Sequence, residues 1–413
     1  MLEGIDANRA PAAPVSLILV SHSYPPVLGG SEIEAQRVCA ALIRRGHRVV
    51  VLCAGGGPMP DIATWVDPAG VPVRILARRT GGRLQHYAFA LAVAWTLFKE
   101  RRNYQLVYFL MQGVHLATGL PVARWLGKAI VMKVSGSSLV TLMRKSWIGR
   151  LELRWLQAWA YRVMVLNEGM AEEARAAGLE PRRLLWMPNP VDTDEFAPCD
   201  SGRRQEIRAR LDIPAEAAAV IFVGRLAPEK ELSSLIGAFG EVVRRMPRAI
   251  LILLGDGPSR GSLEGRAGQL GLSASVRFAG NQPAAGVPGW LQAGDLFTLV
   301  SSNEGFPCSL VEAMSAGIAS VVSDIPANTQ LIDSGVHGLR VPVGDEACIA
   351  EAIVELLGDP KSRARMGTAA RRRVLENYST DKVVGRYETL FEEALRAAPS
   401  AHSQAGVGTR GDA

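Results

Sequence analysis

The chain has 413 residues, of which 48% are hydrophobic and 21% charged, and its formal net charge is +6. This is the composition of an ordinary globular protein, and the length exceeds what one hydrophobic core usually supports, which predicts two domains. Five scattered cysteines form no metal-like pair, and their odd number argues against a disulfide framework, so we expect a reduced, cytoplasmic protein.

Neither the first residues nor the apolar runs predict a signal peptide or a membrane span. Residues 1–14 lack a basic start followed by an apolar core. The longest apolar run, residues 87–98, is shorter than the roughly 20 residues that span a bilayer, and we expect it to form a buried helix.

The charge is unevenly distributed along the chain. Residues 1–190 contain 23 Lys and Arg against 12 Asp and Glu, a net charge of +11, whereas the remainder carries a net −5. A half this basic favours an anionic surface or ligand for that half alone. We expect no nucleic-acid partner.

In the first half, apolar runs of strand length alternate with helical segments. The expected strands are residues 15–21, 48–53, 106–110, 129–134 and 162–166, and the expected helices are residues 31–45, 117–126 and 168–177. Ser31 is expected to cap the first of these helices and Asn167 the last. Near-continuous apolar strands that alternate with helices predict a parallel sheet with helices on both faces.

A Pro-rich, extended link over residues 187–198 interrupts this alternation, which then resumes. The expected strands of the second half are residues 219–223, 249–254, 276–279, 296–300, 320–323 and 339–343. The residues after about 397 have the composition of a disordered tail. Because ligands of such sheets bind at the carboxyl ends of the strands, we expect the site in a cleft between two facing α/β domains.

Two carboxylates, Glu304 and Glu312, delimit the segment EGFPCSLVE between an expected strand and a helix. Backbone N–H groups at the start of a helix favour an anion, so acids beside them are better suited to bind hydroxyls. A ligand that carries both phosphate and hydroxyls is a sugar nucleotide. Alternatively, both residues are ordinary helix-entry acids favoured by the helix dipole.

Two cations, Arg225 and Lys230, follow the expected strand 219–223 in the segment GRLAPEK. One at the strand end and one at the next helix start would converge and neutralise a diphosphate leaving group. The alternative is two solvated surface cations.

Two glycine turns are weaker candidates. Gly29-Gly30 after the first strand either lets a phosphate approach the backbone or forms a plain strand-to-helix turn. The turn at Gly255 either accommodates a base or reverses the chain.

Residues 144–162 read RKSWIGRLELRWLQAWAYR, and place Trp147, Leu151, Trp155 and Trp159 at helical spacing among basic residues. This pattern is typical of an interfacial membrane helix, and equally of an amphipathic helix that faces the core with a basic outer face. The histidines at 22, 47, 86, 115 and 337 show neither metal-ligand spacing nor a triad, so no metal site is expected.

Taken together, these segments resemble the retaining glycosyltransferases of family 4, and the resemblance covers about residues 15–392. It rests on the order and spacing of six motifs: Gly29-Gly30-x-Glu32, RRGHRV at 44–49, MPNPVDTDEFAP at 187–198, GRLAPEK at 224–230, LLGDGP at 253–258 and EGFPCSLVEAMSAGIASVVSD at 304–324. The resemblance implies the GT-B fold, with two Rossmann-like parallel-sheet domains facing across a cleft.

The resemblance further implies an acceptor-side domain at 15–190 and a nucleotide-sugar-binding domain at 191–380. A C-terminal helix at about 381–397 would pack back on the first domain, and residues 398–413 would form the tail.

Roles for single residues are also implied by the resemblance. As catalytic residues, Arg225 and Lys230 would hold the donor diphosphate in place of a metal, and Glu304 would bind hydroxyls of the transferred sugar. Glu312 would take the ribose hydroxyls. The other implied donor-binding positions are Gly30, Gly224, Gly255, Phe278, Gly305, Phe306, Pro307, Cys308, Ser309 and Leu310.

This chain departs from the family pattern at two positions. Family members often carry a histidine where this chain has Ser135, which cannot become cationic but can hydrogen-bond a sugar hydroxyl. Lys133 and His115 are candidates to compensate. The second departure is Glu231, where glycine is commoner.

The expected reaction is transfer of a sugar, with retention of configuration, from a UDP-sugar or GDP-sugar to a hydroxyl of a lipid-linked or polysaccharide acceptor. No metal or other cofactor is expected, and the protein would work in the cytoplasm or peripherally on the inner face of the plasma membrane. Two alternatives stay open: a nucleotide-sugar epimerase of the same fold, and a non-catalytic nucleotide-sugar-binding scaffold. An NAD-dependent enzyme is disfavoured because GxGxxG is lacking.

Overall fold

The structure is a computed structural model that describes residues 13–26, 30–55, 63–77, 83–111, 113–135 and 139–398. It divides the chain into two compact units. Unit 1 runs to Pro190 and resumes at Thr380, and unit 2 comprises Val191–Ser379. Gly29, the segment 136–138 and the expected tail from residue 399 onward lie outside the described residues.

Unit 1 is built on an eight-stranded sheet of order β3-β4-β2-β1-β5-β6-β7-β8. Its strands are β1 Ser16–Val20, β2 Arg48–Ala54, β3 Thr64–Val66, β4 Pro72–Ala77, β5 Leu106–Leu110, β6 Ala129–Lys133, β7 Arg162–Val165 and β8 Leu184–Trp186. All pair in parallel except β3, which is antiparallel to β4. The predicted parallel sheet of the first half is confirmed.

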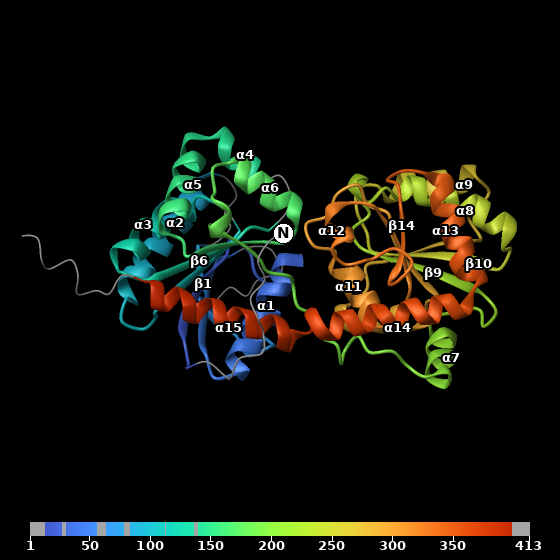
Figure 1. The fold of residues 1–413 in the computed structure, drawn as a ribbon, viewed down its shortest axis with the longest axis horizontal. Coiled ribbons are helices and arrows are strands. Elements are labelled where there is room, and N and C mark those ends of the chain that lie inside the picture. Colours follow the sequence, from blue (N-terminus) through green and yellow to red (C-terminus); the bar gives the residue numbers. More distant parts are fainter. Residues whose placement is uncertain are drawn as a thin grey trace, which may run out of the picture. The chain divides into compact units, whose positions relative to one another are not determined.

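Helices cover both faces of this sheet. They are α1 Gly30–Arg44, α2 Arg83–Lys99, α3 His115–Trp125, α4 Leu139–Lys145, α5 Trp147–Trp159, α6 Glu168–Ala176 and α15 Thr380–Ala397. Helix α2 packs on α3 and α3 on α5, whereas α1 packs with α15 on the other face (Figure 1). Val383, Tyr387 and Phe391 of α15 are fully buried in the same core as β1 and β2.

Unit 2 is built on a six-stranded, all-parallel sheet of order β11-β10-β9-β12-β13-β14. The strands are β9 Ala218–Val223, β10 Ala249–Leu254, β11 Val276–Gly280, β12 Leu296–Leu299, β13 Ser320–Ser323 and β14 Gly338–Val341. Its helices are α7 Ser201–Arg210, α8 Leu232–Arg245, α9 Arg260–Gln269, α10 Val287–Ala293, α11 Cys308–Ser315, α12 Pro326–Thr329, α13 Glu346–Gly358 and α14 Pro360–Asn377. Five of its strands begin and end within one residue of the prediction, and β14 within two.

The helix ends follow the capping chemistry only in part. The Asn167 side chain accepts a hydrogen bond from the Met170 N–H and caps α6, as predicted. The prediction for Ser31 is wrong, because α1 already begins at Gly30 and Ser31 lies inside its first turn.

The prediction that residues 87–98 are a buried helix is wrong for one face of α2. Phe89, Val93 and Leu97 are buried, whereas Tyr87, Leu91 and Trp95 are exposed. The run is apolar all round, so its pattern does not distinguish the face that packs on the sheet from the face that points outward.

Helix α5 does not bury the face that a core-facing amphipathic helix was expected to bury. Its buried positions are Gly149, Glu152, Leu153 and Leu156, and not the tryptophan positions. Trp147 is exposed, and Trp155 and Trp159 are half-buried and stacked with their ring centroids 5.2 Å apart. Within the described ranges, no helix is long and apolar enough to cross a membrane.

Candidate active site

The carboxyl ends of β9 and β12 bring a lysine and a glutamate together. These strands are neighbours in the parallel sheet, so the loops that follow them leave from the same edge. Lys230 ends the 3₁₀ turn Pro228–Lys230 after β9, and Glu304 lies in the loop after β12. The Lys230 Nζ lies 2.6 Å from Glu304 Oε1.

The Lys230–Glu304 pair is held in place but reachable. The Ser301 hydroxyl donates to the same Glu304 Oε1 at 2.7 Å, and Ser301 itself is fully buried. The side chains of Lys230 and Glu304 keep 16% and 10% of their surface exposed. A charged pair so placed can exchange a partner with a ligand without first being extracted from a core.

Arg225 does not join Lys230 in this structure. It is exposed, and its Nη2 lies 2.8 Å from Glu229 Oε1, one turn further along the same segment. The pKa of Glu229 is lowered, first by a hydrogen bond from backbone and then by Arg225. The predicted convergence of the two cations would therefore require Arg225 to leave Glu229.

The departure at Glu231 has a backbone counterpart. Glu231 has φ 51° and ψ 31°, in the left-handed region, and it links the 3₁₀ turn to α8. A residue with a Cβ is strained in this region and glycine is not. This explains why a glycine would fit the position and leaves Lys230 beside a strained residue.

Glycines let the loops after β9 and β10 touch. A Cβ on Gly255, whose φ is 129°, would lie 2.0 Å from the carbonyl oxygen of Gly224. A Cβ on Gly257 would lie 2.4 Å from the carbonyl oxygen of Leu226. The Leu226 N–H donates to the Asp256 carbonyl at 3.0 Å, so the two loops are joined directly.

Phe278 lies near the end of the edge strand β11, next to the Gly255 turn. It pairs with Leu253 of β10, and the Gly255 N–H donates to the Gly280 carbonyl at 2.8 Å. Its side chain is half-buried. Phe278 and Gly255, two of the implied donor-binding positions, thus lie together at the carboxyl ends of the neighbouring strands β11 and β10.

The segment from Glu304 to Glu312 forms a loop and then α11. Phe306, Pro307 and Leu310 are buried, and the Phe306 ring lies 6.3 Å from that of Tyr378. The Cys308 N–H donates to the Phe306 carbonyl and the Leu310 N–H to the Pro307 carbonyl. The more accessible members of the segment are half-buried: Glu304, Gly305, Cys308, Ser309 and Glu312.

Unit 1 carries the two remaining predicted positions, Gly30 and Ser135. Gly30 is exposed at the start of α1. Ser135 follows β6 and is buried, and its hydroxyl has no hydrogen-bond partner among the residues that the structure describes. A buried hydroxyl without a partner is unusual, and a ligand hydroxyl would satisfy it.

Neither residue suggested as a substitute for the missing histidine can act as an accessible cation. Lys133 is fully buried and ion-paired with Glu34. His115 is buried too, and desolvation lowers its pKa to about 3, which keeps it neutral.

Comparison with known proteins places the chain in a family. The family described as Glycosyltransferase Family 4 matches residues 28–195, and the one described as Glycosyl transferases group 1 matches residues 203–373. The GDP-mannose-dependent alpha-(1-6)-phosphatidylinositol monomannoside mannosyltransferase of Mycolicibacterium smegmatis is 31% identical over 377 residues, which cover 88% of this chain and 94% of that protein.

The chain belongs to glycosyltransferase family 4. It is similar as well to the N-acetyl-alpha-D-glucosaminyl L-malate synthase of Bacillus anthracis, at 24% identity over 90% of this chain and 96% of that protein. The crystal structure of Anabaena HepE with UDP and glucose superimposes with a TM-score of 0.76 at 19% identity, and covers 92% of this chain and all of that one. The protein is thus a glycosyltransferase with the GT-B fold.

The serines that hold Glu304 in position were not identified from the sequence. Ser301 holds Glu304, and the Ser323 hydroxyl at the end of β13 donates to the Ser301 carbonyl. Asn328 then donates to the Ser323 carbonyl at 2.9 Å. Serines at the ends of two otherwise apolar strands were the available signal.

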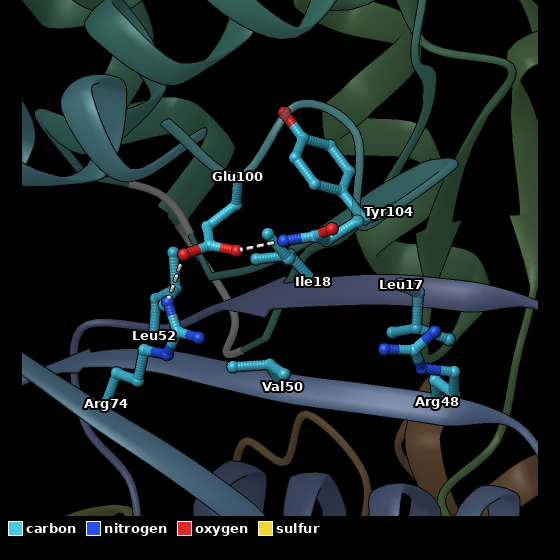
Figure 2. Close-up of a pocket in the computed structure, with 9 residues that line it drawn as sticks. Leu17, Ile18, Arg48, Val50, Leu52, Arg74, Glu100 and Tyr104 are labelled. Carbon is cyan, nitrogen blue, oxygen red and sulfur yellow. Dashed lines mark hydrogen bonds and ion pairs between the residues drawn. The ribbon is translucent and has the colours of Figure 1, made fainter. Parts of the chain in front are cut away.

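A pocket elsewhere in unit 1 contains none of the predicted residues (Figure 2). It is lined by residues of β1, β2 and β4 and by the turn between α2 and β5, and it includes none of the residues that follow the carboxyl ends of the strands. Glu100 occupies one side, where it accepts from Arg74 at 2.9 Å and from Asn103 at 2.6 Å. This pocket is not a candidate for the glycosyltransferase centre.

Proposed function

We propose that this family 4 enzyme transfers a sugar from a nucleoside-diphosphate sugar, with retention of configuration, to a hydroxyl of a lipid-linked or polysaccharide acceptor. The observation that carries the proposal is the reachable Lys230–Glu304 pair at the carboxyl ends of β9 and β12. The names of the relatives support a UDP- or GDP-sugar, since HepE was crystallised with UDP and the M. smegmatis relative is GDP-mannose-dependent.

In the proposed reaction, the bond between the anomeric carbon and the diphosphate oxygen breaks, and its electron pair stays on the oxygen. The Lys230 ammonium stabilises that charge, and Arg225 adds to it on leaving Glu229. The acceptor oxygen bonds to the anomeric carbon on the same face, and its proton passes to the departing diphosphate. No protein nucleophile is needed.

Glu304 orients the donor sugar in this scheme. Its Oε1 is held by both Lys230 and Ser301, which fixes the plane of the carboxylate before the donor binds. A carboxylate held in one plane accepts hydrogen bonds from the sugar hydroxyls in one orientation only. Glu312 takes the ribose hydroxyls, and Ser135 binds a further hydroxyl of the donor.

The proposal includes a cytoplasmic enzyme that acts on the inner face of the plasma membrane and needs no metal. The basic residues of unit 1 and the lipid acceptors in the names of several relatives support the location. Arg225 and Lys230 supply the positive charge that a metal ion otherwise brings to a diphosphate.

The test is to incubate the protein with UDP-glucose, UDP-N-acetylglucosamine and GDP-mannose, each with and without a lipid extract and with EDTA. We expect one donor to yield a glycolipid with an α-linkage, read from the one-bond carbon–proton coupling at the anomeric centre, and EDTA to leave the rate unchanged. A β-linked product would refute retention. A C2-epimerised donor formed without acceptor would instead establish the epimerase alternative.

A further inference from the structure

The outer surface of unit 1 carries a stripe of exposed apolar side chains that nothing in the transfer reaction uses. Tyr87, Leu91 and Trp95 follow one another at four-residue intervals on α2, and 52%, 66% and 66% of their surfaces are exposed. Residues four apart lie on one face of a helix, so these three form a line about 12 Å long at 1.5 Å per residue. Their neighbours Phe89, Val93 and Leu97 face the core instead.

Helix α3 extends the stripe. Trp125, at its end, is 67% exposed, and its ring stacks on Phe98 of α2 with centroids 5.9 Å apart and planes 17° apart. Phe98 also lies 6.3 Å from Trp95. Tyr87, Leu91, Trp95, Phe98 and Trp125 thus form one apolar surface, which we call the aromatic stripe.

The part of unit 1 that carries the aromatic stripe is rich in basic residues. Residues 83–162 contain 12 Lys and Arg, of which Lys133 is buried and paired with Glu34, and only two acids, Glu100 and Glu152. Glu152 is buried, and Glu100 is hydrogen-bonded to Arg74 and Asn103. Lys99 and Arg101 are exposed at the end of α2, and the Arg101 guanidinium lies 4.8 Å above the Phe98 ring.

We propose that the aromatic stripe docks the enzyme on an anionic lipid bilayer, with the aromatic side chains at headgroup depth and the flanking cations on lipid phosphates. Tryptophan and tyrosine prefer the interface between headgroup and hydrocarbon, and basic residues are attracted to anionic headgroups. The aromatic stripe lies on α2 and α3, whereas the sequence alone suggested membrane contact by residues 144–162. The biological purpose of docking rests on the proposed lipid-linked acceptor, but the docking itself does not.

A second copy of the chain is the less suitable occupant. A two-fold dimer through the stripe would place the basic surroundings of one copy against those of the other. An anionic bilayer complements both the apolar and the basic part of the surface.

The aromatic stripe begins near the carboxyl ends of the unit 1 strands. Helix α2 follows β4 and its first turns lie at the carboxyl ends of the parallel strands, where the acceptor side of unit 1 is expected. Tyr87 lies in those first turns, and Leu91 and Trp95 lead away from them. Docking by the stripe would bring this edge of unit 1 close to the headgroups.

The test is co-sedimentation of the full chain with vesicles of phosphatidylcholine alone or with about a third phosphatidylglycerol, at low and high salt, with neither donor nor acceptor present. We expect binding to the anionic vesicles that weakens at least tenfold in the variant Leu91→Gln/Trp95→Gln/Trp125→Gln, and that weakens with salt because the basic part is screened. The matched control Leu270→Gln/Leu375→Gln changes exposed leucines of unit 2 and should bind as wild type.

Two further readouts keep the proposal separate from the transfer reaction. The triple variant should retain the wild-type melting temperature and its affinity for UDP or GDP, because the replaced side chains are exposed and lie in unit 1. Equal vesicle binding by wild type and triple variant, or none by wild type, would overturn the proposal whatever the enzyme transfers. A dimer in light scattering that the triple variant abolishes would replace the bilayer with a second copy.

Discussion

Each unit carries a buried or half-buried Lys–Glu pair near the carboxyl ends of its strands, and the two pairs differ in access. In unit 1, Lys133 at the end of β6 contacts Glu34 of α1, and the side chains are 0% and 2% exposed. In unit 2, Lys230 and Glu304 remain partly exposed. The same chemistry is enclosed in one unit and open to a ligand in the other.

The surroundings of the Lys133–Glu34 pair explain its enclosure. Lys133 also donates to Asn189 Oδ1 at 2.9 Å and to the Tyr387 hydroxyl at 3.2 Å, and Tyr387 donates to Glu34 at 3.0 Å. These four residues come from β6, α1, α15 and the segment that ends the first part of unit 1 at Pro190. The pair therefore ties the returning helix α15 to the sheet, whereas the Lys230–Glu304 pair ties only two loops.

The largest effect should follow from breaking the open pair. Lys230→Ala removes the cation that stabilises the departing diphosphate in the proposed reaction, and we expect a loss of about 10³-fold in kcat, as for other preorganised electrostatic groups. Lys361→Ala, which removes an exposed lysine on α14, is the matched control and should leave the rate within twofold. Steady-state kinetics with whichever of the three donors supports transfer measure both, and a Lys230→Ala rate close to wild type would contradict the assignment.

Breaking the enclosed pair should cost stability instead. Lys133→Met leaves the Glu34 carboxylate buried without its cation, which we expect to lower the free energy of unfolding of unit 1 by about 3 kcal/mol. Urea denaturation measures this loss, and the double variant Lys133→Met/Glu34→Met should recover part of it. Full wild-type stability in the single variant would show that the pair is not what holds α15.

Unit 1 also buries another glutamate, Glu152, whose contribution to stability depends on pH. Burial raises the pKa of Glu152 to about 7, and its ordinary value is 4.5. Between these values the unfolded chain is ionised and the folded chain is protonated, so the stability contribution falls as pH rises from about 4.5 to about 7.

Glu152→Gln should remove this fall. The free energy of unfolding of the variant should increasingly exceed that of wild type from pH 5 to pH 7. At pH 8 the difference should reach up to about 3 kcal/mol. Urea unfolding of both proteins at pH 5, 6, 7 and 8 gives the difference directly. A difference independent of pH would mean that Glu152 is ionised in the folded protein.

The smallest effect concerns strain beside the open pair. Glu231→Gly should relieve the left-handed backbone conformation and stabilise unit 2 by about 1 kcal/mol, with the transfer rate within twofold of wild type. Thermal unfolding and the same kinetic assay measure the two quantities. A large fall in rate would show that the Glu231 side chain takes part in the reaction.

Much of the fold was predictable because its strands are continuous apolar runs bounded by glycine or polar residues. The Asn167 cap and most strands of unit 2 follow from such local signals. The motif residues Lys230 and Glu304 could be identified as candidates, but their direct contact joins residues 74 positions apart and needed the structure.

What the sequence could not predict depends on three-dimensional packing. The exposed face of α2 is as apolar as its buried face, so composition placed the whole helix in the core. Arg225 pairs with Glu229 because the two are one turn apart in the folded segment. The Lys133–Glu34 pair joins residues 99 apart and encloses a lysine that the sequence had left available as a substitute cation.

The most direct test of the difference between the two pairs is calorimetric titration of wild type, Lys230→Met and Lys133→Met with UDP and with GDP. If the open pair holds the diphosphate, Lys230→Met should weaken binding of the preferred nucleotide at least tenfold, about 1.4 kcal/mol, while folded Lys133→Met binds as wild type. Unchanged affinity in Lys230→Met, or an equal loss in both variants, would contradict the account.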